Sequence, residues 1–352
     1  AMGISVEDVV VASTGVIGQP LKIEPIAAGM EKLTSLLSDD GSAEACTAIM
    51  TTDTKKKEAA VEFLIGDTVC HLGGIAKGSR EAAALAAKAI MTTDTVSKEA
   101  AVSFELPAAG GEGSVTVNLG GMSKGSGMIH PNMCTMLAFL TTDVAISPKM
   151  LQAALSGDVK NTFNMTSVDG DTSTNDMAVI LANGLAGNHE ITEEGEAFTA
   201  FMTALNTVTV ALCRMIAGDG EGATKLLECV VTGGKNQETA KTVARSVISS
   251  SLTKAAMFGE DANWGRILCA IGYSGADVDV QKIDVAFRSD AGEVVVCKDG
   301  AGVEFSEELA AKILHETEID ILIDLKDGEA GATAWGCDLT YDYVKINGDY
   351  RT

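Results

Sequence analysis

The stretch KGSGMIHPNMCT, residues 124–135, runs directly into the apolar residues 136–140. Its glycines permit backbone angles that other residues disfavour, and its proline restrains the chain. The pattern predicts a turn that leads into a buried segment and places the hydroxyl of Thr135 at the junction. A threonine whose own backbone amine is freed by cleavage of the preceding bond carries a nucleophile and a base on one residue. By composition alone, Thr135 would be an ordinary core or capping residue.

Strand-like and helical patterns occur in mixed order on both sides of this stretch. Alternating or compact apolar runs predict strands at 8–12, 57–63, 68–72, 100–105, 114–119, 278–287, 293–297, 319–325 and 341–346. Helical spacing predicts helices at 25–37, 80–91, 197–217 and 238–250, and a helix through His315 with Ser306 as its N-cap. Residues 133–140 fit either a buried helix or a strand. The mixed order predicts an α+β architecture with layered sheets.

An internal repeat occupies the region before Thr135. The motif AIMTTDT at 48–54 recurs at 89–95, KEAAV at 57–61 recurs at 98–102, and LGGIAKGS at 72–79 recurs as LGGMSKGS at 119–126. Two copies are too few for a solenoid, so we interpret segments 48–79 and 89–126 as a local duplication. The two copies cannot both occupy the same position in the fold, and only the second continues into Thr135. We therefore expect the second copy to carry the function and the first to lie outside the pocket.

Composition and charge exclude several classes of function. The net charge is -23, from 26 basic and 49 acidic residues, and such a surface repels nucleic-acid phosphates. No uninterrupted apolar run approaches the roughly 18 residues of a membrane span, and residues 1–7 show no secretory signal. Eight scattered cysteines without a CxxC pair are typical of reduced thiols in a cytosolic protein. Asp169, Asp171 and Asp176 lack the full calcium-loop pattern, so we expect a structural turn and no metal site.

The Thr135 stretch and the following MLAFLTTD resemble the self-processing junction of the bifunctional ornithine/glutamate N-acetyltransferase family, whose members act in arginine biosynthesis. Further blocks agree in family order: STGVIG (13–18), MTTDT (91–95), VDGDTSTND (168–176), GDGEGATK (218–225), GEDANWGRIL (259–268), WGCDLTYDYV (335–344) and KINGDYRT (345–352). The resemblance implies a layered α/β/β/α sandwich. It also implies autocleavage between Cys134 and Thr135 into an α-chain-like segment, 1–134, and a β-chain-like segment, 135–352, assembled as a cytoplasmic heterotetramer.

The resemblance further implies roles for matching residues. Thr135 would be the nucleophile, Thr14 and Gly15 would form the oxyanion hole, and Glu221 would face the nucleophile and the substrate amine. Substrate contacts would come from Lys124, from Thr92 or Thr93, from Asn347 and from Thr352. No metal or bound cofactor is implied. The sequence leaves open whether acetyl-CoA serves as a co-substrate.

The implied reaction is ping-pong acetyl transfer from N-acetylornithine to glutamate, which yields ornithine and N-acetylglutamate. Two alternatives stay open: a self-processing aminopeptidase or amidase, in which water resolves the acyl-enzyme, and an inactive folded relic that binds an amino acid. Three features depart from the family pattern. Residues expected before STGVIG are missing, the copy at 48–79 is extra, and Cys134 stands where we expect alanine.

Overall fold

The computed structural model describes residues 5, 23–35, 59–65, 68–74, 87, 88, 90–111, 113–133 and 136–349. The chain divides into two compact units, residues 1–91 and 92–352. The predicted strand at 8–12 and most of the predicted helix at 80–91 lie outside the described residues. The predicted division between residues 134 and 135 concerns cleavage of the chain, and it stays a prediction.

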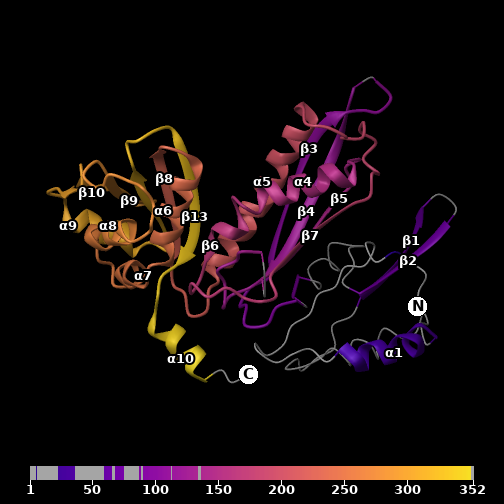
Figure 1. The fold of residues 1–352 in the computed structure, drawn as a ribbon, viewed down its shortest axis with the longest axis horizontal. Coiled ribbons are helices and arrows are strands. Elements are labelled where there is room, and N and C mark those ends of the chain that lie inside the picture. Colours follow the sequence, from indigo (N-terminus) through magenta and orange to yellow (C-terminus); the bar gives the residue numbers. More distant parts are fainter. Residues whose placement is uncertain are drawn as a thin grey trace. The chain divides into compact units, whose positions relative to one another are not determined.

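The described part of the first unit contains helix α1 and one hairpin (Figure 1). Helix α1 spans Ile23–Ser35, and strands β1 (Ala59–Ile65) and β2 (Thr68–Gly74) pair in antiparallel fashion. The predicted helix at 25–37 and the predicted strands at 57–63 and 68–72 are confirmed to within two residues at each end.

A four-stranded sheet of the second unit contains the last strand before Thr135 and the first strand after it. Its order is β3-β4-β5-β7, with β5 antiparallel to β4 and parallel to β7. Its strands are β3 (Lys98–Pro107), β4 (Ser114–Lys124), β5 (Leu137–Thr142) and β7 (Met177–Ala182). Burial alternates along β5, as expected of a strand with one face in the core. Within the stretch 133–140, for which a helix and a strand were both open, residues 137–140 belong to a strand.

The two copies of the repeat form the same hairpin in the same register. In the first copy Ala60 lies opposite Gly73, and in the second Ala101 lies opposite Gly120. These are corresponding positions of the repeat, although the loop is longer in the second copy. Each hairpin belongs to its own unit, so the duplicated segment folds alike in both places.

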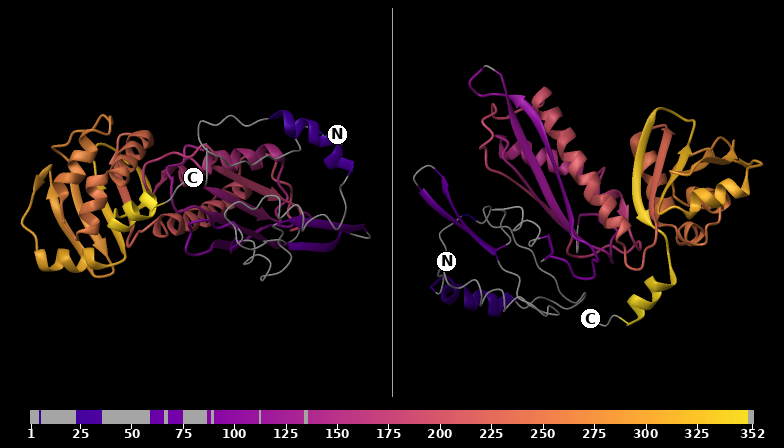
Figure 2. Two further views of the ribbon diagram at one scale, coloured as in Figure 1. Left: turned by 90° about the horizontal axis from the view of Figure 1, so that it is seen from below. Right: turned by 180° about the vertical axis from the view of Figure 1, so that it is seen from behind.

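Helix α5 (Glu196–Gly218) packs along β3 and β4 and also contacts β8 and β13 of the second sheet (Figures 1 and 2). It buries an apolar stripe at helical spacing: Phe201, Leu205, Val208, Leu212 and Ile216. Among the described residues it is the one helix long and apolar enough to cross a membrane by length and composition. Polar residues interrupt its sequence, and half of its most apolar window is buried inside the protein.

A seven-stranded sheet forms the other half of this unit, in the order β11-β10-β9-β12-β8-β13-β6. Its strands are β6 (Thr166–Ser167), β8 (Leu226–Gly234), β9 (Asp284–Ser289), β10 (Gly292–Lys298), β11 (Ala301–Gly302), β12 (Glu318–Asp324) and β13 (Ala330–Cys337).

Helix α6 (Gln237–Ser249) packs on β8 and β13, and α9 (Glu307–His315) packs on β9 and β10. Ser306 caps α9 as predicted, since its hydroxyl accepts from the Leu309 amide. This unit also contains α4 (Pro148–Asp158), η2 (Phe163–Met165), α7 (Ser251–Phe258) and α8 (Trp264–Gly272). The predicted α+β class is confirmed.

The C-terminal element corrects one prediction. Residues 341–346 do not form a strand; they lie in helix α10, Tyr341–Asp349. The Thr340 hydroxyl accepts the Tyr343 amide at 3.3 Å, the bond of a helix N-cap, and donates to the Gly222 carbonyl at 2.7 Å. The alternation of two tyrosines with Asp342 is typical of a strand, but Thr340 before them caps the start of a helix.

Candidate active site

Three turns of the second unit are joined by hydrogen bonds. The first precedes β3 and carries Thr93, the second follows β4 and carries Ser126, and the third follows α5 and carries Glu221. The Thr93 and Ser126 hydroxyls lie 2.6 Å apart, and the Glu221 amide donates to the Ser126 carbonyl at 2.8 Å. Segments far apart in sequence are thus joined at Ser126, a residue that the sequence did not single out.

Lys124 is the last residue of β4 and is buried. Its amine donates to the Thr92 hydroxyl at 2.8 Å and lies 3.7 Å from a carboxylate oxygen of Asp94. Burial lowers the pKa of Lys124, and the charge of Asp94 offsets this only in part. Thr92 is therefore the neighbour of the predicted substrate-binding lysine, whereas Thr93 bonds to Ser126.

Glu221 lies against the glycine-rich turn that follows Lys124. A Cβ added at Gly127 would lie 2.4 Å from the Glu221 carboxylate carbon, so only glycine permits this approach. The amide of Asn347 on α10 donates to Glu221 Oε2 at 2.9 Å. The negative charge of Glu221 also acts on the Lys124 amine. The structure thus brings together three predicted site residues: Lys124, Glu221 and Asn347.

A buried ionic network supports this cluster, and it was not predicted. Lys98 is fully buried and donates to Asp94 at 2.7 Å and to Asp219 at 2.5 Å. The Asp94–Lys98 pair has the i,i+4 spacing of a local ion pair, which is a signal visible in the sequence. The pairing with Asp219 spans 121 residues, and no local pattern indicates it.

Two aspartates hold the backbone on either side of the expected cleavage junction. Asp169 accepts the amides of Met128 and Ile129 at 2.6 and 3.1 Å, and Asp176 accepts the Met136 amide at 2.9 Å. The interpretation of this aspartate-rich stretch as a structural turn is thereby supported. Met133 has a φ of 49°, a left-handed conformation that is strained for a residue with a side chain.

Thr14, Gly15, Cys134, Thr135 and Thr352 lie outside the described residues. Their assignment as nucleophile, oxyanion hole, cleavage site and substrate contact stays a prediction.

His130, four residues before the junction, is held in a neutral state. Arg245 donates to its Nε2 at 2.6 Å, so its proton sits on Nδ1, which lies 3.0 Å from the Ser167 hydroxyl. Burial, with a further contribution from Arg245, lowers the pKa of His130 to about 4. This neutral imidazole links the junction segment to α6 and β6.

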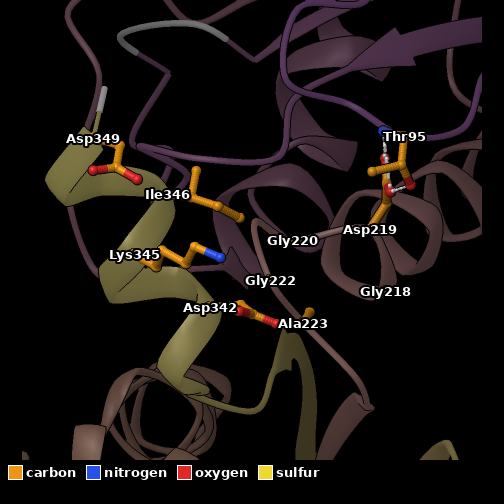
Figure 3. Close-up of a pocket in the computed structure, with 10 residues that line it drawn as sticks. All are labelled: Thr95, Gly218, Asp219, Gly220, Gly222, Ala223, Asp342, Lys345, Ile346 and Asp349. Atoms are coloured by element: carbon orange, nitrogen blue, oxygen red, sulfur yellow. Dashed lines mark hydrogen bonds between the residues drawn. The ribbon is translucent and has the colours of Figure 1, made fainter. Parts of the chain in front are cut away.

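An open pocket of about 480 Å³ lies beside the network, between the turn after α5 and helix α10 (Figure 3). Thr95 and Asp219 line one side, and Lys345 and Ile346 of α10 line the other. Figure 3 shows Thr95 hydrogen-bonded to Asp219. The lining carries both signs of charge, which suits a zwitterionic ligand better than an apolar one.

A model of the ArgJ family matches residues 1–81 and 79–352, and each match contains one copy of the repeat. The arginine biosynthesis bifunctional protein ArgJ 1 of Clostridium acetobutylicum is 45% identical over 346 residues, which cover 98% of this chain and 73% of that protein. The arginine biosynthesis bifunctional protein ArgJ of Symbiobacterium thermophilum is 46% identical over 352 residues, which cover all of this chain and 75% of that protein.

A solved structure agrees with these relatives. The crystal structure of the arginine biosynthesis bifunctional protein ArgJ from Bacillus halodurans superposes with a TM-score of 0.57 at 47% identity and covers 60% of this chain and 98% of its own. Since the family model matches this chain from residue 1 to residue 352, and the relatives align with nearly all of it, the chain belongs to the ArgJ family.

Proposed function

We propose that this chain is an acetyltransferase of arginine biosynthesis that moves the acetyl group of N-acetylornithine to glutamate. The observation that carries the proposal is the meeting of Lys124, Thr92, Glu221 and Asn347 at one end of β4, in a chain of the ArgJ family. The buried ammonium of Lys124 can bind a substrate carboxylate, and the nearby carboxylate of Glu221 can bind a substrate amine.

The proposed reaction uses Thr135 as the nucleophile. Its hydroxyl attacks the acetyl carbonyl of N-acetylornithine and passes its proton to the α-amine of the same residue. The amide C–N bond breaks, and ornithine leaves after its amine takes up that proton. The acetyl group then rests as an ester on Thr135. The amine of glutamate attacks this ester, the C–O bond breaks, and N-acetylglutamate leaves as the hydroxyl is restored.

The other site residues have supporting roles in this proposal. Thr14 and Gly15 stabilise the oxyanion, an effect that typically contributes about 3 to 4 kcal/mol per donor. Glu221 positions the amine that leaves or attacks. Lys124 and Thr92 bind the amino-acid part of the substrate, and Asn347 and Thr352 close over it. The reaction requires no metal, and acetyl-CoA would enter as a second acetyl donor to the same Thr135.

Autocleavage before Thr135 is the step that frees the amine. The left-handed Met133 supports this proposal because strained backbone conformations are concentrated at functional sites. Strands β4 and β5 lie on opposite sides of the junction and are paired over six residues each, so the two products would stay in one sheet. We extend the proposal to a cytoplasmic heterotetramer of the two fragments.

Incubation with N-acetylornithine, with and without glutamate, tests the function. We expect N-acetylglutamate and ornithine to appear in equal amounts when both substrates are present. Steady release of free acetate that does not depend on glutamate would instead identify an amidase. An intact chain that binds ornithine but forms no product would identify a binding protein.

A further inference from the structure

Lys98 faces the interior of the protein rather than a substrate. It is fully buried, and its amine donates to two carboxylates and, at 3.4 Å, to the Val96 carbonyl. A buried ammonium is stable only when it is paired and hydrogen-bonded. Its pairing with both Asp94 and Asp219 meets this need, so the three side chains form one unit.

Asp94 connects this unit to the predicted substrate-binding lysine. Its Oδ1 accepts from Lys98 and, at 2.6 Å, from the amide of Gly125, which directly follows Lys124. Its Oδ2 accepts the Thr92 amide at 3.2 Å and faces the Lys124 amine at 3.7 Å. Bonds to the amide and the lysine amine keep the pKa of Asp94 low although burial acts to raise it. Asp94 therefore fixes both Lys124 and Thr92.

Asp219 connects the same unit to the turn that carries Glu221. It is the C-cap residue of α5, two positions before Glu221. Its carboxylate accepts the Thr95 amide at 3.0 Å, the Val96 amide at 3.4 Å, the Thr95 hydroxyl and the Lys98 amine. One carboxylate thus joins the loop before β3 to the turn after α5.

We propose that Asp219 is a positioning residue that acts through Lys98 and Asp94 to hold Lys124 toward the substrate and to balance the charge around its amine. The proposal deepens the proposed function, on which it rests for the role of Lys124. The charges alternate from one end of the network to the other: Asp219 is negative, Lys98 positive, Asp94 negative and Lys124 positive. Glu221 adds a further negative charge that acts on Lys124.

Charge alternation gives opposite predictions for two neutralising substitutions. Asp219→Asn leaves the network one unit more positive, which disfavours the protonated amine and lowers the pKa of Lys124. Lys98→Met removes a cation that acts on Lys124, which raises that pKa. The two substitutions should therefore shift the Lys124 titration in opposite directions. A residue that merely supported the fold would not shift the same group in opposite directions.

The test measures Lys124 directly by an NMR titration of protein whose lysines carry ¹³C at Cε. The Lys124 signal is the one that disappears in Lys124→Arg. The duplication supplies a matched control, because Lys57→Met makes the Lys98 change in the first copy of the repeat and should leave the Lys124 titration unchanged. The double variant Lys98→Met/Asp219→Asn removes one charge of each sign and should bring the pKa back toward its original value.

Kinetics complete the test. Asp219→Asn should raise the KM for N-acetylornithine roughly tenfold, as expected when a hydrogen bond to a charged group is disturbed, with a smaller effect on kcat. Shifts of the Lys124 pKa in one direction for both single variants, or no shift in either, would overturn the proposal. The titration needs no turnover, so a wild-type protein that fails to transfer acetyl would contradict the proposed function while leaving this test decisive.

Discussion

Gly127 shows how a single residue type can determine the geometry of the site. Its Cα lies so close to the Glu221 carboxylate that a methyl group there would overlap all three carboxylate atoms. Gly127→Ala should therefore displace Glu221 and lower kcat/KM on the order of tenfold to a hundredfold, the cost of misplacing a reacting group by about 1 Å. The measurement is steady-state acetyl transfer from N-acetylornithine to glutamate.

Gly110→Ala is the matched control for this change. A Cβ at Gly110 meets nothing within 4 Å, so that variant should keep the wild-type rate and melting temperature. If Gly127→Ala transfers acetyl as fast as Gly110→Ala, the close approach of Glu221 has no role in the reaction.

His130 predicts a specific loss of stability in acid. In the folded protein its pKa is about 4, whereas an unfolded chain has the ordinary value of 6.5. The unfolded state therefore binds a proton first as the pH falls, and the free energy of unfolding decreases between about 6.5 and 4. Allowing for its partial exposure, the loss is on the order of 1 to 3 kcal/mol.

Melting temperatures across this pH range check the prediction. His130→Gln cannot be protonated, so its stability should fall less steeply with acid than that of the wild type. Arg245 and Asp171 are the charged groups that act on this imidazole, and both remain in the variant. Parallel curves for the two proteins would contradict the assignment of a neutral, buried His130.

At the scale of elements, regular apolar spacing was a reliable guide. The stripe from Phe201 to Ile216 predicted α5 to within one residue at each end, and Ser306 marked the start of α9. Prediction failed where polar and apolar residues alternate without a sheet to pair with, as at residues 341–346. The strand predicted at 278–287 begins only at Asp284, because the apolar residues before it lie in a loop.

The pairing of β4 with β5 has a consequence for the cleaved protein. Six residue pairs from Leu119–Thr142 to Lys124–Leu137 join the strand before the junction to the strand after it. Fragments 1–134 and 135–352 should therefore elute together on a native sizing column and separate only in denaturant. Elution of a free 135–352 fragment under native conditions would show that this sheet does not hold the products together.

At the scale of the whole molecule, the duplication raises the question of which copy the protein needs. The second copy places Asp94, Lys98 and Lys124 in the network with Asp219, a residue outside the repeat that occurs once. Deletion of residues 48–88 joins Thr47 to Ala89 and leaves one copy. The deletion should preserve or raise the melting temperature, measured by calorimetry. A fall of many degrees would show that the first hairpin belongs to a core that the protein requires.

The sequence predicted the members of the site better than their connections. Lys124, Glu221 and Asn347 were identified by resemblance, and the structure brings them together. The bond from Lys98 to Asp219 could not be predicted, because it depends on how α5 crosses the four-stranded sheet. Lys124 bonds to the hydroxyl of Thr92 and not to that of Thr93. This choice likewise depends on the path of a loop and not on its composition.

In the proposed reaction Thr135 is freed by cleavage and then carries the acetyl group. Mass spectrometry of the protein after incubation with N-acetylornithine and no acceptor would detect both events. We expect two fragments, 1–134 and 135–352, with one acetyl group on the second that disappears when glutamate is added. Thr135→Ala should abolish cleavage and acetylation, and Thr135→Ser should retain part of each. An uncleaved wild-type chain that transfers acetyl, or a Thr135→Ala protein that transfers it at the original rate, would contradict the account.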